Sequence, residues 1–443
     1  MSSVMEEYRR KLISAEDAAA MIQSNQIVDY YAFNASSRYV DAALAKRVGD
    51  LENVVIRSEL RLAPPMEVFM ADPEGRTFRL HSLFRGPIEN LVPPEHSTSI
   101  PARLGSYEAL FWAGELRSDF AAFMVSPPDK DGYLHFWPSP ALALADVRAS
   151  GVFFAEINET YRHFRYPTEE CRVHISEVNY IIEGDNPPIF PVPSPPISET
   201  DQHIAEHILG ELCDGACLQI GYGSVPNAVA NLIVHSDLKD LGVQTELIPE
   251  GIMELYKAGK ITGRRKGVDK GKMTASFVIG GSDLLSFVND CADLMMCSSS
   301  YTNNPHIIGQ NENFVAINGC LQIDLTGQVN SESLHGLTYT GTGGQLDFVL
   351  GAAISKNGKS ILCTPSTYTT KEGEVKSRIV SALAPGTIVT TPRSCVHYIV
   401  TEHGIVNLRG RSEQERAHLL IGIAHPDFRG DLLRQAKERK LIW

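Results

Sequence analysis

Short runs of β-branched and aromatic residues alternate along the chain with segments whose apolar residues recur at helical spacing. The predicted strands are Ile27–Tyr31, Asn53–Arg57, Phe120–Val125, Val152–Ile157, Cys217–Ile220, Val243–Leu247 and Ser276–Ile279. Helices are predicted over Ser37–Gly49 and Val225–Ile233. Strands that alternate with helices indicate βαβ units and mostly parallel sheets. We therefore expect an α/β fold whose active-site groups lie at the carboxyl ends of strands.

A proline-rich segment, Gly184–Ile197, interrupts this pattern near the middle of the chain. Its prolines are Pro187, Pro188, Pro191, Pro193, Pro195 and Pro196. Because proline fixes φ and lacks an amide donor, neither a helix nor a central strand continues through this segment. We predict an amino-terminal domain over residues 1–186, a linker over 187–197 and a carboxy-terminal domain over 198–443. A long surface loop within a single domain is the alternative.

Composition narrows the class of protein further. Lys and Arg total 40 against 53 Asp and Glu, a net charge of −13, which disfavours a nucleic-acid or membrane-surface binder. No apolar run approaches the ~18 residues of a membrane span, and the polar segment Met1–Lys11 lacks the features of a signal peptide. The eight cysteines are scattered without a CxxC pair, so we expect reduced thiols, no metal site and a cytoplasmic location.

A glycine-rich turn follows the predicted strand Cys217–Ile220. The turn consists of Gly221, Tyr222, Gly223, Ser224 and Val225. Glycines allow a ligand to approach the backbone closely, and the first turn of the following helix offers free amides to an anion. Pro226 departs from the dinucleotide-binding fingerprint, and no GK[ST] follows for a phosphate loop. An ordinary strand–turn–helix corner is the alternative.

Glu246 lies in the predicted strand Val243–Leu247, where apolar and polar residues alternate. Such an acidic residue is most often a solvated surface group or a helix cap. Glu250 provides a comparison, because it precedes Gly251 and a predicted helix and is expected in a turn or cap.

A second glycine-rich loop contains Gly341, Gly343 and Gly344 and follows a strand-like run that ends near Asp324. Two such turns in one predicted domain indicate a ligand that the backbone approaches from two sides.

Ten short motifs, in this order and with matching spacing, resemble the acetyl-CoA hydrolase/transferase family, which belongs to the family I CoA-transferases. They are SPPDKDGY (126–133), GYGSVPNAV (221–229), TELIPEG (245–251), GKM (271–273), IDLTGQVNSE (323–332), GGQLDF (343–348), TPR (391–393), VTEHG (400–404), NLRG (407–410) and AHPDFR (424–429). The resemblance implies two related open α/β domains with the active site between them, and a homodimer or higher homo-oligomer.

The resemblance also implies a role for each candidate residue. Glu246 would attack an acyl-CoA thioester and become a glutamyl-CoA thioester, and Asn330 would orient the reacting group. The two glycine turns would supply backbone amides to the developing oxyanion. CoA would be a substrate and not a bound cofactor, with Lys359 as a candidate for its contact. The basic run Gly263–Lys272 is a second candidate, or else a solvated turn.

These residues predict a CoA-transferase that moves CoA from a short-chain acyl-CoA to a small carboxylate such as acetate, butyrate, 4-hydroxybutyrate or a dicarboxylate. Two alternatives stay open at this point. Water could replace the acceptor, which would make the protein an acyl-CoA hydrolase, or the scaffold could serve as a non-catalytic sensor of CoA or a metabolite.

Overall fold

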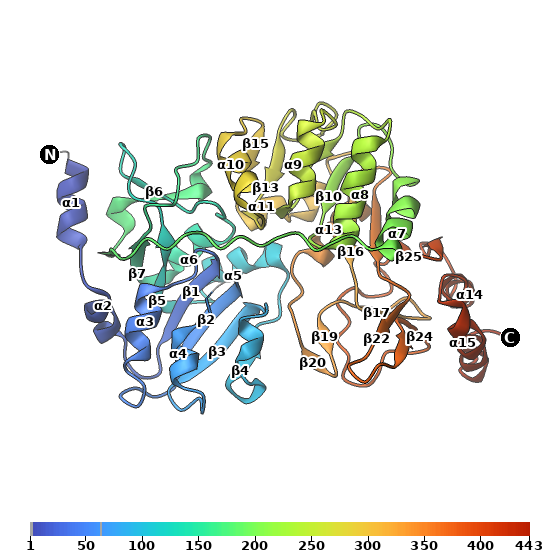
Figure 1. The fold of residues 1–443 in the computed structure, drawn as a ribbon, viewed down its shortest axis with the longest axis horizontal. Helices are drawn as coiled ribbons and strands as arrows, with labels where there is room; N and C mark the ends of the chain where they lie inside the picture. Colours follow the sequence, from blue (N-terminus) through green and yellow to red (C-terminus); the bar gives the residue numbers. More distant parts are fainter. Residues whose placement is uncertain (1–2, 63) are drawn as a thin grey trace. The chain divides into compact units, whose positions relative to one another are not determined.

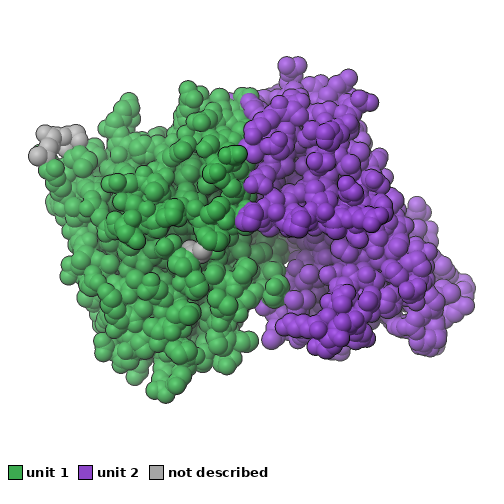
Figure 2. Space-filling model, viewed as in Figure 1, with its two compact units in different colours: residues 1–192, 275–301, 339–343 green, residues 193–274, 302–338, 344–443 purple. Residues whose placement is uncertain are grey.

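The computed structural model describes residues 3–62 and 64–443, and its chain folds into two compact units. Unit 1 comprises residues 1–192, 275–301 and 339–343, and unit 2 comprises residues 193–274, 302–338 and 344–443. Figure 1 shows the elements and Figure 2 colours the two units. The chain first passes from unit 1 to unit 2 inside the proline-rich segment, and two later segments return to unit 1. Met1 and Ser2, part of the polar segment considered above, lie outside the described residues.

A seven-stranded sheet, parallel at every pairing, forms the centre of unit 1. Its strands, in spatial order, are β4 (Ser97–Ser99), β3 (Phe78–Phe84), β2 (Val54–Arg61), β1 (Ile27–Phe33), β5 (Ser118–Val125), β7 (Ser150–Ile157) and β9 (Tyr180–Ile182). The inner strands are buried on both faces, which explains their nearly continuous apolar sequences.

Helices cover both faces of this sheet (Figure 1). Core side chains on one face come from α2 (Ala15–Met21), α3 (Tyr39–Ala45) and α4 (Glu67–Ala71). On the other face α6 (Ala143–Ala149) packs on the central strands and α5 (Tyr107–Ala113) packs on α6. Unit 1 also contains α1 (Ser3–Lys11), β6 (Tyr133–His135), β8 (Arg172–His174), α10 (Ser282–Asp290), β14 (Phe277–Val278), β15 (Leu294–Met296) and α11 (Ser299–Thr302, whose last residue belongs to unit 2).

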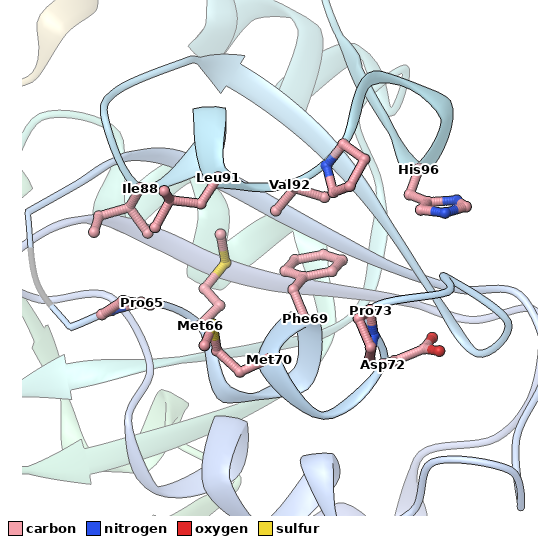
Figure 3. A pocket seen from close by; sticks show the side chains of 11 residues that line it. Pro65, Met66, Phe69, Met70, Asp72, Pro73, Ile88, Leu91, Val92 and His96 are labelled. Carbon is pink, nitrogen blue, oxygen red and sulfur yellow. The ribbon is translucent and has the colours of Figure 1, made fainter.

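An apolar pocket opens on unit 1 between α4 and the segment that follows β3 (Figure 3). Its lining includes Met66, Phe69, Ile88, Leu91 and Val92. No candidate site residue lines this pocket, so we assign it no chemistry.

A six-stranded sheet forms the centre of unit 2. Its order is β11 (Gly242–Val243), β10 (Cys217–Ile220), β16 (Phe314–Gly319), β21 (Lys359–Cys363), β25 (Tyr398–Thr401) and β26 (Gly404–Asn407). Every pairing is parallel except the last, between β25 and β26.

The helices of unit 2 complete its layers. They are α7 (Glu199–Leu209), α8 (Ser224–His235), α9 (Glu250–Lys257), α12 (Pro305–Ile308), α13 (Gln345–Ile354), α14 (Glu413–Gly422) and α15 (Pro426–Glu438). One core joins α12 and α13 to β10 and β16, and a larger core joins α14 and α15 to β17 (Gln322–Asp324), β24 (Ile379–Val380) and β25. The remaining short strands are β12 (Leu247–Ile248), β13 (Met273–Ala275, whose last residue belongs to unit 1), β18 (Val329–Asn330), β19 (Ser333–Leu334), β20 (Leu337–Thr338), β22 (Thr367–Thr369) and β23 (Val375–Ser377).

The predicted fold class is confirmed, since each unit is an α/β structure built on a mostly parallel sheet. The predicted strand Val243–Leu247 is wrong as a single strand, because it is divided into the two-residue strands β11 and β12. Among residues 3–62 and 64–443, no helix has the length and apolarity that a membrane span requires.

Candidate active site

Glu246 lies on a bend between β11 and β12, and not on an alternating strand as predicted. β10 pairs with β11 at Gly242 and Val243, while its last residues, Gln219 and Ile220, pair with β16. Thr245 then donates its backbone N–H to the carbonyl of Thr274 at 2.9 Å and its Oγ1 to the carbonyl of Leu247 at 3.0 Å. Because Glu246 lies on this bend, its side chain does not follow the alternation between sheet faces that a strand would impose.

The amide of Asn303 holds the carboxylate of Glu246. Its Nδ2 donates to Glu246 Oε2 at 2.8 Å and approaches Asp347 Oδ2 at 3.5 Å. Its Oδ1 accepts from Thr302 Oγ1 at 3.0 Å, which fixes the amide with its donor end toward the two carboxylates. Sequence reasoning missed Asn303, which directly follows the short helix α11 and stands before Asn304, the N-cap of α12.

Gly344 brings the amino terminus of α13 against the same carboxylate. A Cβ atom at position 344 would overlap Glu246 Oε2 and Asn303 Nδ2, so any other residue there would displace these two side chains. Gly344 is the N-cap of α13, whose first-turn amides lack partners within the helix. The structure therefore joins two predicted site residues, Glu246 and Gly344, at a helix terminus suited to negative charge.

The surroundings raise the pKa of Glu246 to about 7. Burial of the carboxyl is the largest cause, although the residue as a whole is only partly buried. The hydrogen bond from Asn303 lowers the pKa and the negative charge of Asp347 raises it. The carboxylate is thus less stable here than in water, which suits a nucleophile.

The first glycine turn begins at the carboxyl end of β10, on the same sheet. Gly223 is the N-cap of α8 with φ +142°, a conformation that favours glycine, and Ser224 opens the helix. Gly221 donates to the carbonyl of Ile317, while Val225 is buried. The exposed Tyr222 donates its hydroxyl to the carbonyl of Pro193 at 2.9 Å.

The second glycine loop lies at the passage of the chain from unit 1 to unit 2. Gly341 and Gly343 belong to unit 1, where Gly341 packs closely on Phe84 and the Gly343 carbonyl accepts from Leu104 N at 2.9 Å. Gly344 is the first residue of the loop in unit 2. Within unit 2, the structure places Gly344 beside Glu246.

Asn330 is buried within its own turn. Its Nδ2 donates to Ser333 O at 2.8 Å, and its Oδ1 accepts from the amides of Glu332 and Ser333 and from the Ser333 hydroxyl. These bonds occupy both ends of the amide, and in the described part of the chain none of them reaches Glu246. The orienting role of Asn330 stays a prediction, and Asn303 is the amide found in that position.

The basic candidates for CoA binding have partners of their own. Lys359 Nζ lies 2.7 Å from Glu211 Oε2 and 5.8 Å from the ring centre of Tyr398. In the run 263–272, Lys266 is buried and its Nζ donates to Lys272 O and Thr274 Oγ1, both at 2.9 Å. Arg264 in the same run is exposed. Lys359 therefore stays a prediction for a CoA contact.

The residues that could hold a metal do not cluster: within residues 3–62 and 64–443 there is no group of three or more His, Cys, Asp or Glu side chains arranged for one. The site consists instead of a carboxylate, an amide and a helix terminus.

Comparison with known proteins shows the family of the chain. Residues 2–193 match the acetyl-CoA hydrolase/transferase N-terminal domain, and residues 280–436 match the C-terminal domain of the same family. The chain belongs to the acetyl-CoA hydrolase/transferase family.

Two curated relatives and one solved structure are similar over nearly the full chain. A probable butyrate:acetyl-CoA coenzyme A-transferase of Syntrophomonas wolfei is 40% identical over 99% of this chain and 98% of its own. A butyryl-CoA:acetate CoA-transferase of Anaerostipes caccae is 38% identical over 100% and 99%. The crystal structure of 4-hydroxybutyrate CoA-transferase from Porphyromonas gingivalis is 31% identical, with a TM-score of 0.79 over 98% of this chain and 99% of that chain.

Proposed function

We propose that this protein is an acyl-CoA:carboxylate CoA-transferase that works by a ping-pong mechanism with Glu246 as its nucleophile. The observation that carries the proposal is the site of Glu246 itself. Its carboxylate leaves the sheet at a bend, is held by Asn303 and lies against Gly344 at the amino terminus of α13. Membership of a family whose relatives are named CoA-transferases supports the same reaction.

The reaction proceeds in two half-reactions. The Glu246 carboxylate attacks the thioester carbonyl, and the C–S bond breaks to give a mixed anhydride and CoA thiolate. The thiolate attacks the glutamyl carbonyl, which forms the glutamyl-CoA thioester and releases the donor's acyl group as a carboxylate. An acceptor carboxylate then reverses these steps, so that the thioester bond is conserved throughout.

Each attack places negative charge on a carbonyl oxygen. The first-turn amides of α13, which have no acceptor within the helix, are fixed donors for that charge beside Glu246, and one such donor contributes ~2.7–4 kcal/mol in other enzymes. The amides at the start of α8, after Gly223, are the second candidate set.

The proposed substrates are a short-chain acyl-CoA and a small carboxylate such as acetate, butyrate, 4-hydroxybutyrate or a dicarboxylate, with CoA as substrate and no permanently bound cofactor. We also propose a cytoplasmic homo-oligomer. The eight cysteines support a reducing compartment, since each is a free thiol.

Reductive trapping tests the proposal directly. Borohydride added after the acyl-CoA donor should reduce the glutamyl thioester to an alcohol, and digestion should locate the mass loss on the peptide that contains Glu246. A label on a cysteine, or no label while turnover continues, would exclude the mechanism. Thioester loss that is equally fast with and without added carboxylate would identify a hydrolase of the same family.

A further inference from the structure

Asp347 is a second carboxylate beside the nucleophile, and the mechanism above does not use it. It is fully buried in the first turn of α13, three residues after Gly344. Asn303 Nδ2 lies between the two carboxylates, 2.8 Å from Glu246 Oε2 and 3.5 Å from Asp347 Oδ2. One amide group thus bridges two acidic side chains that otherwise repel each other.

We propose that Asp347 is a positioning residue that favours the loaded enzyme, because it orients Asn303 and disfavours the negatively charged form of the Glu246 side chain beside it. The inference rests on the proposed function of Glu246 as nucleophile. It goes further in assigning to Asp347 an effect on the balance between free and CoA-loaded enzyme.

Charge balance explains the direction of the effect. In the first half-reaction the Glu246 carboxylate becomes a neutral thioester, and the negative charge departs on the released carboxylate. A neighbouring negative charge destabilises the starting carboxylate and not the neutral thioester. Asp347 therefore shifts the equilibrium toward the glutamyl-CoA thioester, while the hydrogen bond from Asn303 fixes the orientation of the Glu246 carboxylate.

A purely structural role is the competing interpretation. An acidic residue in the first turn stabilises a helix by interaction with its dipole, and Asp347 occupies such a position in α13. A structural role predicts a loss of stability on substitution but no change in the pH at which Glu246 loads. The charged group that acts on the Glu246 carboxyl in the described residues is Asp347, since Asn303 is neutral.

The test measures the borohydride-trapped fraction of enzyme at fixed ratios of acyl-CoA to free carboxylate, from pH 5 to pH 9. In Asp347→Asn we expect the loaded-to-free ratio to fall by on the order of tenfold, and the pH midpoint of loading to fall by about one unit. Asp347→Glu, which keeps the charge, should return the loaded-to-free ratio and the pH midpoint of loading most of the way to their wild-type values. Asp324→Asn is the matched control, because Asp324 is equally buried but bonds within its own turn, to Thr326 and Gln328.

The outcomes separate the two proposals. Wild-type enzyme that cannot be labelled at Glu246 would refute the proposed function. Normal labelling of wild type with an unchanged ratio and midpoint in Asp347→Asn would refute only the role of Asp347. If Asp347→Asn does not fold, Asp347→Ser gives the same neutral comparison without added bulk, and failure of both to fold would assign Asp347 to stability alone.

Discussion

Glu246 and Glu250 are four positions apart in the chain, but their carboxylates accept hydrogen bonds from different donors and lie at the starts of different helices. The Glu246 carboxylate accepts from Asn303 beside the amino terminus of α13. Glu250 is the first residue of α9, and its carboxylate accepts from Ser194 Oγ at 2.6 Å. One carboxylate is held by an amide side chain beside a helix terminus, and the other lies at the first residue of a helix.

This difference predicts the effect of removing each side chain. Glu246→Ala should abolish CoA transfer, because the proposed covalent intermediate forms on the Glu246 carboxylate. Glu250→Ala should retain transfer and lose about 1 kcal/mol of stability from the helix start. Steady-state rates with parallel thermal unfolding check both variants, and transfer that survives in Glu246→Ala would overturn the mechanism.

Gly344→Ala should inactivate the enzyme without unfolding it. The added methyl group overlaps Glu246 Oε2 and Asn303 Nδ2, and a displacement of about 1 Å at a reacting group can cost ~10²-fold in rate. Gly422→Ala is the control, since a Cβ there meets no atom within 4 Å at the end of α14. Equal activity of the two variants would show that α13 does not confine the nucleophile.

The stability of the protein should depend on pH through Glu246. Its pKa is raised from 4.5 to about 7, so the folded state loses stability as the pH rises from 4.5 through 7, while the unfolded chain ionises first. Glu246→Gln should therefore be more stable than wild type at pH 8, by up to about 3 kcal/mol, and should match it near pH 4.5. Denaturant titrations at the two pH values decide this, because a pH-independent difference would point to packing instead.

Gly223→Val should weaken CoA binding while the domain stays folded. The φ of +142° at Gly223 strains any β-branched residue, and the substitution would shift the start of α8. Gly319→Ala, which has open space and no positive φ, should bind normally. Calorimetric titration with CoA is the measurement. Unchanged affinity for CoA in Gly223→Val would show that this turn is an ordinary strand–turn–helix corner that does not bind CoA.

The sequence predicts the sheets better than it predicts the site. Strands buried on both faces, such as β5 and β10, have apolar sequences long enough to recognise, and both were located closely. The bend at Glu246 was missed because its alternating neighbours resemble a strand, whereas the ladder between β10 and β11 ends at Val243.

The residues that contact Glu246 could not be predicted from the sequence, for a different reason. Asn303 is 57 residues from Glu246 in the chain, and its neighbour Asn304 gives this short segment an ordinary local explanation as a helix start before Pro305. Only the tertiary fold shows that its amide faces two carboxylates. Asp347 was visible inside the motif GGQLDF, but nothing in that motif states which neighbour its charge acts on.

The interleaving of the two units along the chain has a consequence for biosynthesis. A ribosome finishes the first segment of unit 1 early, yet residues 275–301 and 339–343 of that unit emerge only after Glu246 has been made. Asp347 and the start of α13 emerge later still. Neither unit can be expressed as one uninterrupted fragment, and a nascent chain lacks the start of α13, which lies beside Glu246, until about three-quarters of it has been translated.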